Sequence, residues 1–378
     1  MRDDFMLPSL DLEYLKTTLT QLLLTPSPVG DTERGSDLCV ELLCALGDLH
    51  VETTRKGVVV ARWKGTKNDV PRAVTAHIDT LGALVKGIKE TGRLSLSQLG
   101  NYSWNAVENE GVTVINQDGK SFRGLIQISN PSHHLYSSGE GNNEVPRSQK
   151  TMEVRLDERV SSAEEVQKLG IEVGDFVYLD PRPEWNGGFI RSRHLDDKAL
   201  VACLLTAAKA IIDAGLVPAQ NTALHIANYE EVGHGGASGI PRETEQVLAL
   251  DVAPTGMGQN GDEFSCTLAI ADSDGPYDAG MRRRLRELAK EHQIAQTRYF
   301  SRILLGRRRA LESGRRYASR AHRAGRRWHP FARAHPPRRA RSHHANDRRV
   351  ASQRKLNIPK KTVFAPQFRE NGFCEASL

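Results

Sequence analysis

The chain opens with apolar residues at helical spacing, followed by a stretch in which apolar and polar residues alternate. Leucines recur three or four positions apart over residues 9–24 and stop before two prolines, which predicts a helix. A second helix is expected over residues 31–46. Residues 50–65, HVETTRKGVVVARWKG, alternate with period two around a Lys-Gly pair, which is typical of a β-hairpin. The apolar run RAVTAHIDTLG at residues 72–82 then predicts a strand that ends in polar residues.

From residue 84 to residue 184 the pattern changes to short apolar runs separated by Gly, Asn and Asp. Six of these runs have the length and composition of strands: ALVKGI, RLSLSQL, GVTVIN, FRGLIQIS, MEVRLD and DFVYLD. Such a density of short strands predicts a small all-β unit, either a barrel or a sandwich.

Beyond this unit, strands and helices alternate again. GFIRSRHLDDKALVACLLTAAKAIIDAG predicts a strand followed by a long helix, NTALHIANYEE, VLALDVA and CTLAIAD predict strands, and AGMRRRLRELAKEHQI predicts an amphipathic helix. The simplest architecture is an α/β domain interrupted by an all-β insertion. We therefore expect four segments: residues 1–83 and 185–300 as the two parts of one domain, 84–184 as the insertion, and 301–378 as an atypical tail.

Charge is distributed unevenly along the chain, whose formal net charge is +6. Residues 301–354 hold 17 arginines, no lysine and only two acidic residues, so this block contributes +15 and the rest of the chain −9. Such a contrast marks a boundary in the sequence.

The sequence lacks the features of an exported or membrane-bound protein. No signal-peptide pattern begins it, and no apolar run approaches the roughly 18 residues of a membrane span. The five cysteines are odd in number and show no metal-type pairing, which favours reduced thiols in a cytoplasmic protein.

Acidic and imidazole side chains follow apolar strands at several points. In open α/β sheets, ligands and catalytic groups gather beyond the carboxyl ends of the strands. The candidates lie in the motifs AHID, HLDD, NYEE and ALD, which contain His77 and Asp79, Asp196 and Asp197, Glu230 and Glu231, and Asp251.

These residue types suit a dinuclear metal site. Zinc, cobalt and manganese accept histidine nitrogen and carboxylate oxygen. Two metals about 3.5–4 Å apart can share one carboxylate and polarise a water, while an unbound carboxylate accepts its proton. Acidic pairs commonly lie on solvated helix faces, but here each pair follows an apolar segment. Burying several carboxylates without a cation is costly, which favours a metal site.

Longer motifs make the pattern more specific: TAHIDTLGALVK, NYSWNAVENEGVTV, GFIRSRHLDDKALVACLL, NYEEVGHGGASGIP and LALDVAPTGMGQ followed by DSDGPYD. Over residues 10–300 the chain resembles the deblocking or glutamyl aminopeptidase family, co-catalytic metallopeptidases that form tetrahedral shells. The resemblance implies a zinc-peptidase-like three-layer α/β/α catalytic domain with an inserted barrel-like domain. It also implies a homo-oligomer whose insertion helps to assemble dimers, with no membrane partner.

The same resemblance implies two divalent metal ions, zinc or cobalt, and a role for each candidate residue. His77 and Asp251 are expected to bind one metal and Glu231 the other, with Asp196 bridging both. Glu230 is the expected catalytic base, and Asp79 the residue that supports His77. The expected nearby loop contains Gly233, His234 and Gly235, and His234 is expected to be structural or adjacent to substrate.

The implied activity is the removal of N-terminal residues from peptides by water held between the metals, with Glu230 as general base. One alternative is a metal-dependent deacetylase or other amidohydrolase that acts on a small N-acyl substrate. Another is a nucleic-acid-binding protein on an inactive peptidase scaffold.

The family pattern also requires a C-terminal histidine, in a stretch resembling ALIGPGVD that is soon followed by SH and TH. The arginine-rich block stands in that place. It could be a nucleic-acid-binding tail with Tyr317, Trp328 and Phe331 as stacking residues, although a nucleic-acid partner is not favoured because basic tails usually contain lysine. It could be a disordered low-complexity linker, although it has no repeat.

The interpretation that we favour is a shifted reading frame. Codons can be chosen for residues 320–341 such that dropping one nucleotide yields ALIGPGVDGIPSHAHTHLDAL, which contains the missing histidine motif. The translated chain is then expected to lack the last metal ligand and the final strand and helix, with residues 355–378 also out of frame. Its activity is expected to be impaired, and an exposed sheet edge would favour aggregation.

Overall fold

The computed structural model describes residues 7–136, 141–272, 275–300 and 360–365. A nine-stranded mixed sheet forms the centre of the α/β part of these residues. Eight strands follow one another in the order β1-β2-β12-β3-β13-β17-β14-β15, and β16 pairs with β14. Their bounds are β1 His50–Thr53, β2 Val59–Trp63, β12 Gln220–Ala227, β3 Lys67–His77, β13 Gln246–Leu250, β17 Lys360–Ala365, β14 Cys266–Asp272, β15 Gly275–Pro276 and β16 Gln296–Phe300.

The register of the sheet brings three strand ends to one edge. β3 runs parallel to β12 on one side, where His77 pairs with Ala227, and parallel to β13 on the other, where Thr75 pairs with Ala249. The segments that follow β3, β12 and β13 therefore begin at the same level of the sheet.

Four helices contribute to the main core on the sheet: α1 (Leu12–Leu24), α2 (Glu33–Leu46), α4 (Leu195–Asp213) and α5 (Ala279–Glu291). Their apolar residues pack against alternate strand residues such as Val74 and Ala76 of β3. Alternation in a strand sends the intervening residues to the opposite face. There, Ala73 belongs to a smaller cluster that packs against Ile240, in the segment between β12 and β13.

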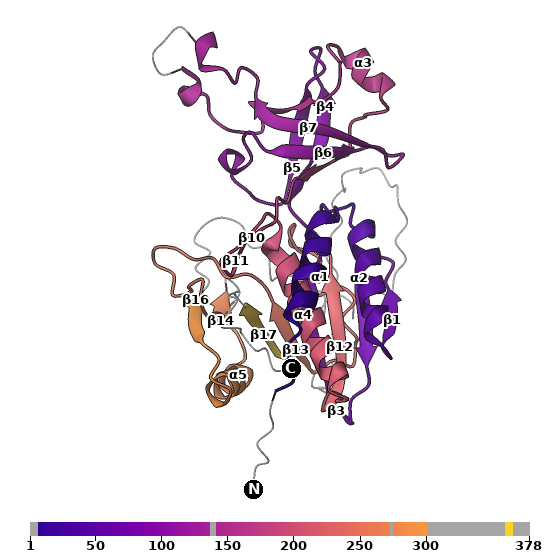
Figure 1. Cartoon of the computed structure of the whole chain (residues 1–378), viewed down its shortest axis with the longest axis vertical. Helices are drawn as coiled ribbons and strands as arrows, with labels where there is room; N and C mark the ends of the chain where they lie inside the picture. The colour runs from indigo at the N-terminus through magenta and orange to yellow at the C-terminus, as the bar shows by residue number, and fades with distance from the viewer. Residues whose placement is uncertain (1–6, 137–140, 273–274, 301–359, 366–378) are drawn as a thin grey trace, which may run out of the picture.

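The insertion forms a closed barrel of six strands in the order β4-β5-β8-β7-β6-β9. It lies at one end of the α/β part (Figure 1). Its strands are β4 Gly82–Ile88, β5 Leu94–Leu99, β6 Gly111–Ile115, β7 Ser121–Ile128, β8 Met152–Leu156 and β9 Phe176–Leu179, with α3 (Ala163–Lys168) before the last. The six apolar runs expected to be strands all lie in this barrel. A separate apolar core fills it, and the mixed α/β fold with an all-β insertion is confirmed. The limits of the four segments stay a prediction.

Several direct contacts join the barrel to the α/β part, among them a hydrogen bond from Arg34 of α2 to the carbonyl oxygen of Gly119. The hydroxyl of Tyr178 in β9 donates a hydrogen bond to the carbonyl of Leu23 in α1, at 2.5 Å. Pro28 and Thr80 form an isolated parallel bridge beside the start of β4. A small hairpin of β10 (Glu184–Asn186) and β11 (Phe189–Arg191) then leads back to α4.

The C-terminal region differs from expectation at one point. We expected the final strand of the sheet to be missing, but residues 360–365 form β17 between β13 and β14. That expectation was wrong because the segment KKTVFA, although unlike the family pattern, combines Thr, Val and Phe, which favour strands. The rest of the arginine-rich tail and the expected frame change lie outside the described residues. Within the described residues, no helix has both the length and the apolarity needed to cross a membrane.

Candidate metal centre

His77 is the central residue of the site that forms at the strand ends. It is the last residue of β3 and its side chain is buried, 4 % exposed. Its Nδ1 lies 3.0 Å from the carbonyl oxygen of Asp79, so Nδ1 carries the proton in that hydrogen bond. In the neutral imidazole, Nε2 then presents a lone pair, which is the arrangement that a metal-binding histidine requires.

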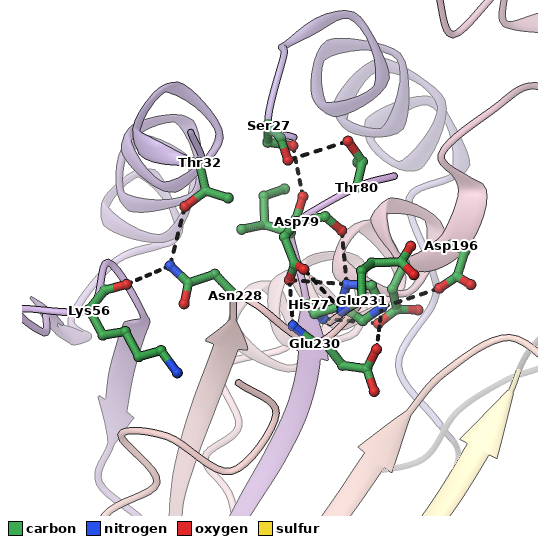
Figure 2. A network of polar contacts seen from close by, with 12 residues as sticks. Ser27, Thr32, Lys56, His77, Asp79, Thr80, Asp196, Asn228, Glu230 and Glu231 are labelled. Atoms are coloured by element: carbon green, nitrogen blue, oxygen red, sulfur yellow. Dashed lines mark hydrogen bonds and ion pairs between the residues drawn. The ribbon is translucent and has the colours of Figure 1, made fainter. Parts of the chain in front are cut away.

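Carboxylates surround Nε2 of His77. Oδ1 of Asp196 lies 3.2 Å from it and Oε2 of Glu230 lies 3.9 Å from it (Figure 2). His77, Asp196 and Asp251 each offer one ligand atom within 4.8 Å of the others. These three residues come from β3, from the first turn of α4 and from the end of β13, so the strand order of the sheet produces the cluster.

Asp79 connects the histidine to the two glutamates. Its carboxylate is fully buried and accepts the backbone N–H groups of Glu230 and Glu231, at 3.2 and 3.1 Å. Its Oδ1 also lies 3.4 Å from Nδ1 of His77. Asp79 therefore fixes the backbone from which both glutamate side chains extend, in addition to supporting the imidazole ring.

Electrostatics indicate an excess of negative charge at these positions. Burial, together with the charge of Asp196, raises the pKa of Glu231 to about 9. The same causes raise the pKa of Asp251 to about 7. Burial lowers the pKa of His77, but hydrogen bonds to Asp196 and Asp79 outweigh it and raise the pKa well above its usual value.

The residues present fit a divalent cation. Oε1 of Glu231 is buried and has no hydrogen-bond partner among the described residues. A single imidazole cannot neutralise the carboxylates around it, whereas a bound cation can. The nitrogen and oxygen donors are those that zinc and related metals accept.

The sequence did not assign roles to some residues that the structure brings to this site. Asp197 is fully buried, and its Oδ2 accepts the backbone N–H of His77 at 3.0 Å. The HLDD motif contained the signal for it. Asn228 and Tyr229 belong to the NYEE motif, in which only the glutamates received a role. Lys56, which contacts both, lies far from that motif in the sequence.

His234 lies apart from the cluster of His77, Asp196 and Asp251. Its Nδ1 and its carbonyl oxygen both contact Nζ of Lys56, at 3.1 and 2.8 Å. The expected C-terminal histidine and the alternatives to it in the tail lie outside the part of the chain that the structure describes.

Comparisons with known proteins agree with this fold. A family model described as M42 glutamyl aminopeptidase matches residues 57–303. The chain is 40 % identical over 279 residues to "Putative aminopeptidase YhfE" of Bacillus subtilis strain 168, covering 73 % of this chain and 79 % of that protein.

Solved structures show the same fold. A TET aminopeptidase from Thaumarchaeota archaeon SCGC AB-539-E09 matches with a TM-score of 0.72 and 18 % identity, covering 94 % of this chain and 88 % of that one. The Pyrococcus horikoshii TET1 peptidase, described as assembling into a tetrahedron or a large octahedral shell, matches with a TM-score of 0.68 and 17 % identity. This match covers 93 % of this chain and 91 % of that one.

The family match and the relative define the class of protein: a peptidase, and so a hydrolase. The chain belongs to the M42 glutamyl aminopeptidase family, whose members are metal-dependent. The family predicted from the sequence motifs is confirmed.

Proposed function

We propose that the chain is a metal-dependent aminopeptidase with a two-metal site, which removes N-terminal residues from peptides and is impaired as translated because the second metal lacks a ligand. The observation that carries this proposal is the convergence of His77, Asp196 and Asp251 on one point, beside two glutamates whose backbone Asp79 fixes. Family membership supplies the reaction class, and the donor set supplies the reason for the metals.

The proposed ligand roles are those that the resemblance to the family implies, and the grouping of His77, Asp196 and Asp251 supports them. His77 and Asp251 would hold one metal, Glu231 the other, and Asp196 would be shared between them. Zinc or cobalt fits nitrogen and oxygen donors of this kind. When bound, the metals would lower the pKa of water and stabilise negative charge on the carbonyl oxygen of the substrate.

The position of Glu230 supports its proposed role as the general base. Its Oε2 lies 3.9 Å from Nε2 of His77, at the edge of the cluster, and its backbone N–H is held by Asp79. Glu230 would accept a proton from the attacking water and return it to the leaving amine. Asp79 would hold His77 in the tautomer that leaves Nε2 free.

Hydrolysis of aminoacyl-p-nitroanilides with different side chains tests this function. We expect turnover that a chelator abolishes and that added zinc or cobalt restores. N-acetylated versions of the same anilides should not be cleaved, because an aminopeptidase requires a free amine. Release of acetate from N-acetyl amino acids without anilide cleavage would instead support the deacetylase alternative.

The ligand assignment has a separate test in Asp196→Ala. Because Asp196 is proposed to bind both metals, this variant should lose metal, measured by elemental analysis after gel filtration. A variant that kept full metal content would contradict the bridging role.

We also propose that the protein forms a homo-oligomer in which the barrel takes part. The described assemblies of the TET1 peptidase support this proposal, since its fold is shared. Light scattering coupled to gel filtration would measure the mass, and a strictly monomeric species at micromolar concentration would contradict it. A cytoplasmic location stays a prediction.

A further inference from the structure

The two glutamates lie on residues 228–235, which we call the glutamate loop, and this loop packs against the turn between β1 and β2. Nδ2 of Asn228 donates hydrogen bonds to the carbonyl of Lys56, at 2.6 Å, and to the hydroxyl of Thr32, at 3.2 Å (Figure 2). Gly57 follows with φ +79°, and a Cβ there would lie 2.9 Å from Nδ2 of Asn228. The β1–β2 turn thus supports the start of the loop through its backbone.

The side chain of Lys56 reaches the other end of the same loop. Its Nζ donates to the carbonyl oxygen of His234 at 2.8 Å and lies 3.1 Å from Nδ1 of that residue, which therefore accepts. Nζ also lies 5.1 Å from the centroid of the Tyr229 ring, and the rings of Tyr229 and His234 are stacked 5.1 Å apart. One ammonium group thus contacts the residues on both sides of the glutamates.

The backbone conformation of the loop explains why such support matters. Tyr229, immediately before Glu230, has φ +59°, a left-handed conformation that is unfavourable for a bulky residue. The N–H of Gly233 donates to the carbonyl of Glu230 at 2.7 Å, which closes a tight turn. A strained turn of this kind keeps its shape only when contacts around it hold it in place.

The partners of Lys56 are unusual for a partly buried lysine near the surface. It contacts a neutral carbonyl, an imidazole and an aromatic ring, and no carboxylate of the described residues lies within ion-pair distance of its Nζ. Partial burial lowers the pKa of Lys56, although Asp79 opposes that shift. A lysine that served only to solvate the surface would keep its ammonium group in contact with water, because contacts at the surface contribute little free energy. The contacts of Lys56 therefore indicate a structural role.

We propose that Lys56 is a positioning residue, which clamps both ends of the glutamate loop so that the carboxylate of Glu230 stays beside His77. This inference rests on the proposed function, since the position of Glu230 matters for turnover only if it is the base. Lys56 acts through the loop and not through contact with the substrate. Its loss should therefore reduce kcat and leave KM nearly unchanged.

The test compares Lys56→Met, which keeps the apolar stem and removes the charge and the donors, with Lys56→Arg. Exposed Lys64, on the connection between β2 and β3, provides the matched control Lys64→Met. We expect Lys56→Met to lower kcat about ten-fold or more, since small misplacements of catalytic groups have large effects, with KM within about two-fold. Lys56→Arg should retain most of the kcat of the wild-type protein. Lys64→Met should have the same kcat and KM as the wild-type protein.

Hydrogen exchange of the glutamate loop provides a readout that does not depend on activity. Amides of residues 230–234 should exchange faster in Lys56→Met than in Lys64→Met, with equal melting temperatures and metal contents. If the unchanged protein cleaves no anilide, the proposed function fails, while the exchange experiment still decides whether Lys56 holds the loop. Unchanged exchange, or a loss of kcat/KM that arises from KM alone, would overturn the proposal.

Discussion

Glu230 and Glu231 are adjacent in sequence, yet their surroundings suit them to different tasks. The Glu231 side chain is largely buried, and Oε1 has no hydrogen-bond partner among the described residues, as expected of a ligand. The Glu230 side chain is 22 % exposed and lies at the edge of the cluster, where it can contact water. The difference follows from the turn that begins at Tyr229, which sends the two side chains to different positions.

Glu230→Gln should therefore separate catalysis from metal binding. The amide keeps the shape of the side chain but cannot accept a proton, so kcat should fall by about 10²–10⁴-fold, the usual contribution of a general base. Metal content should stay unchanged by elemental analysis. Glu245→Gln, at an exposed position before β13, is the control and should keep full activity. Retained turnover in Glu230→Gln would eliminate this residue as the base.

The raised pKa values at the site predict how the stability of the metal-free protein depends on pH. Folded metal-free protein retains protons on Asp251, with a pKa of about 7, and on Glu231, with a pKa of about 9. The unfolded chain releases them near pH 4, so the folded state binds more protons over this interval. The free energy of unfolding should consequently decrease as pH rises from about 5 to 9.

Metal ions compete with those protons for the carboxylates. The affinity of the protein for metal ions should therefore rise over the same pH interval. Melting temperatures of chelator-treated and zinc-loaded protein, measured from pH 5 to pH 9, check both expectations. The difference between the two should widen as pH rises. A chelator-treated protein whose melting temperature increased from pH 5 to pH 8 would contradict the assigned burial of these carboxylates.

At the scale of elements, the glutamate loop depends on one glycine that has no room for a side chain. A Cβ on Gly235 would lie 1.5 Å from the carbonyl oxygen of Asn228, whereas a Cβ on neighbouring Gly236 would meet only Cγ of Glu230, at an ordinary 3.6 Å. Gly235→Ala must displace backbone at the end of β12. We expect a loss of about 1–3 kcal/mol in the free energy of unfolding and reduced activity.

Gly236→Ala is the matched comparison, because it adds the same methyl group one residue away. Chemical denaturation and anilide hydrolysis of the two variants measure the difference. Equal stability of the two would show that the end of β12 adjusts to the added methyl group at little cost.

The sequence identified elements well where a local pattern determines them. The six barrel strands follow from short apolar runs between Gly, Asn and Asp, and α1 (Leu12–Leu24) lies within residues 9–24, where the leucine spacing predicts a helix. We predicted that the candidate ligands lie close together from the rule that ligands bind beyond the carboxyl ends of parallel strands.

Other features depend on contacts between distant residues, which no local pattern reveals. Lys56 and His234 are 178 positions apart, and nothing near Lys56 distinguishes it from an ordinary turn lysine. The left-handed conformation of Tyr229 contradicts its propensity and is imposed by the packing around it. β17 was missed because its segment was judged by family pattern, although its composition favours a strand.

Over the whole molecule, the arginine-rich residues 301–354 have a net charge of +15, and the rest of the chain has a net charge of −9. The described residues supply one cluster of His77, Asp196 and Asp251, and Glu231 beside it. Under our proposal the second metal has fewer ligands than the first, because the arginine-rich block stands where the resemblance places the family's last histidine. Fewer ligands mean weaker binding.

A replacement of residues 320–341 tests this imbalance. The replacement sequence is ALIGPGVDGIPSHAHTHLDAL, the alternative-frame translation, and the segment containing β17 stays unchanged. If this sequence restores the missing ligand, the replaced chain should bind two zinc ions per chain after gel filtration. The chain as translated should retain about one zinc ion, because the second metal lacks one of its ligands. Anilide hydrolysis should rise in parallel with the second ion.

A version of the replacement with all of its histidines changed to alanine separates restored ligation from the mere removal of arginines. It should bind metal as the translated chain does, since it lacks the added nitrogen donors. All three chains could bind the same number of zinc ions and hydrolyse the anilide at the same rate. In that case the tail does not affect the site, and a shifted reading frame would not explain impaired activity. If only the histidine-containing version gains the second ion, the arginine-rich block stands where the last ligand belongs.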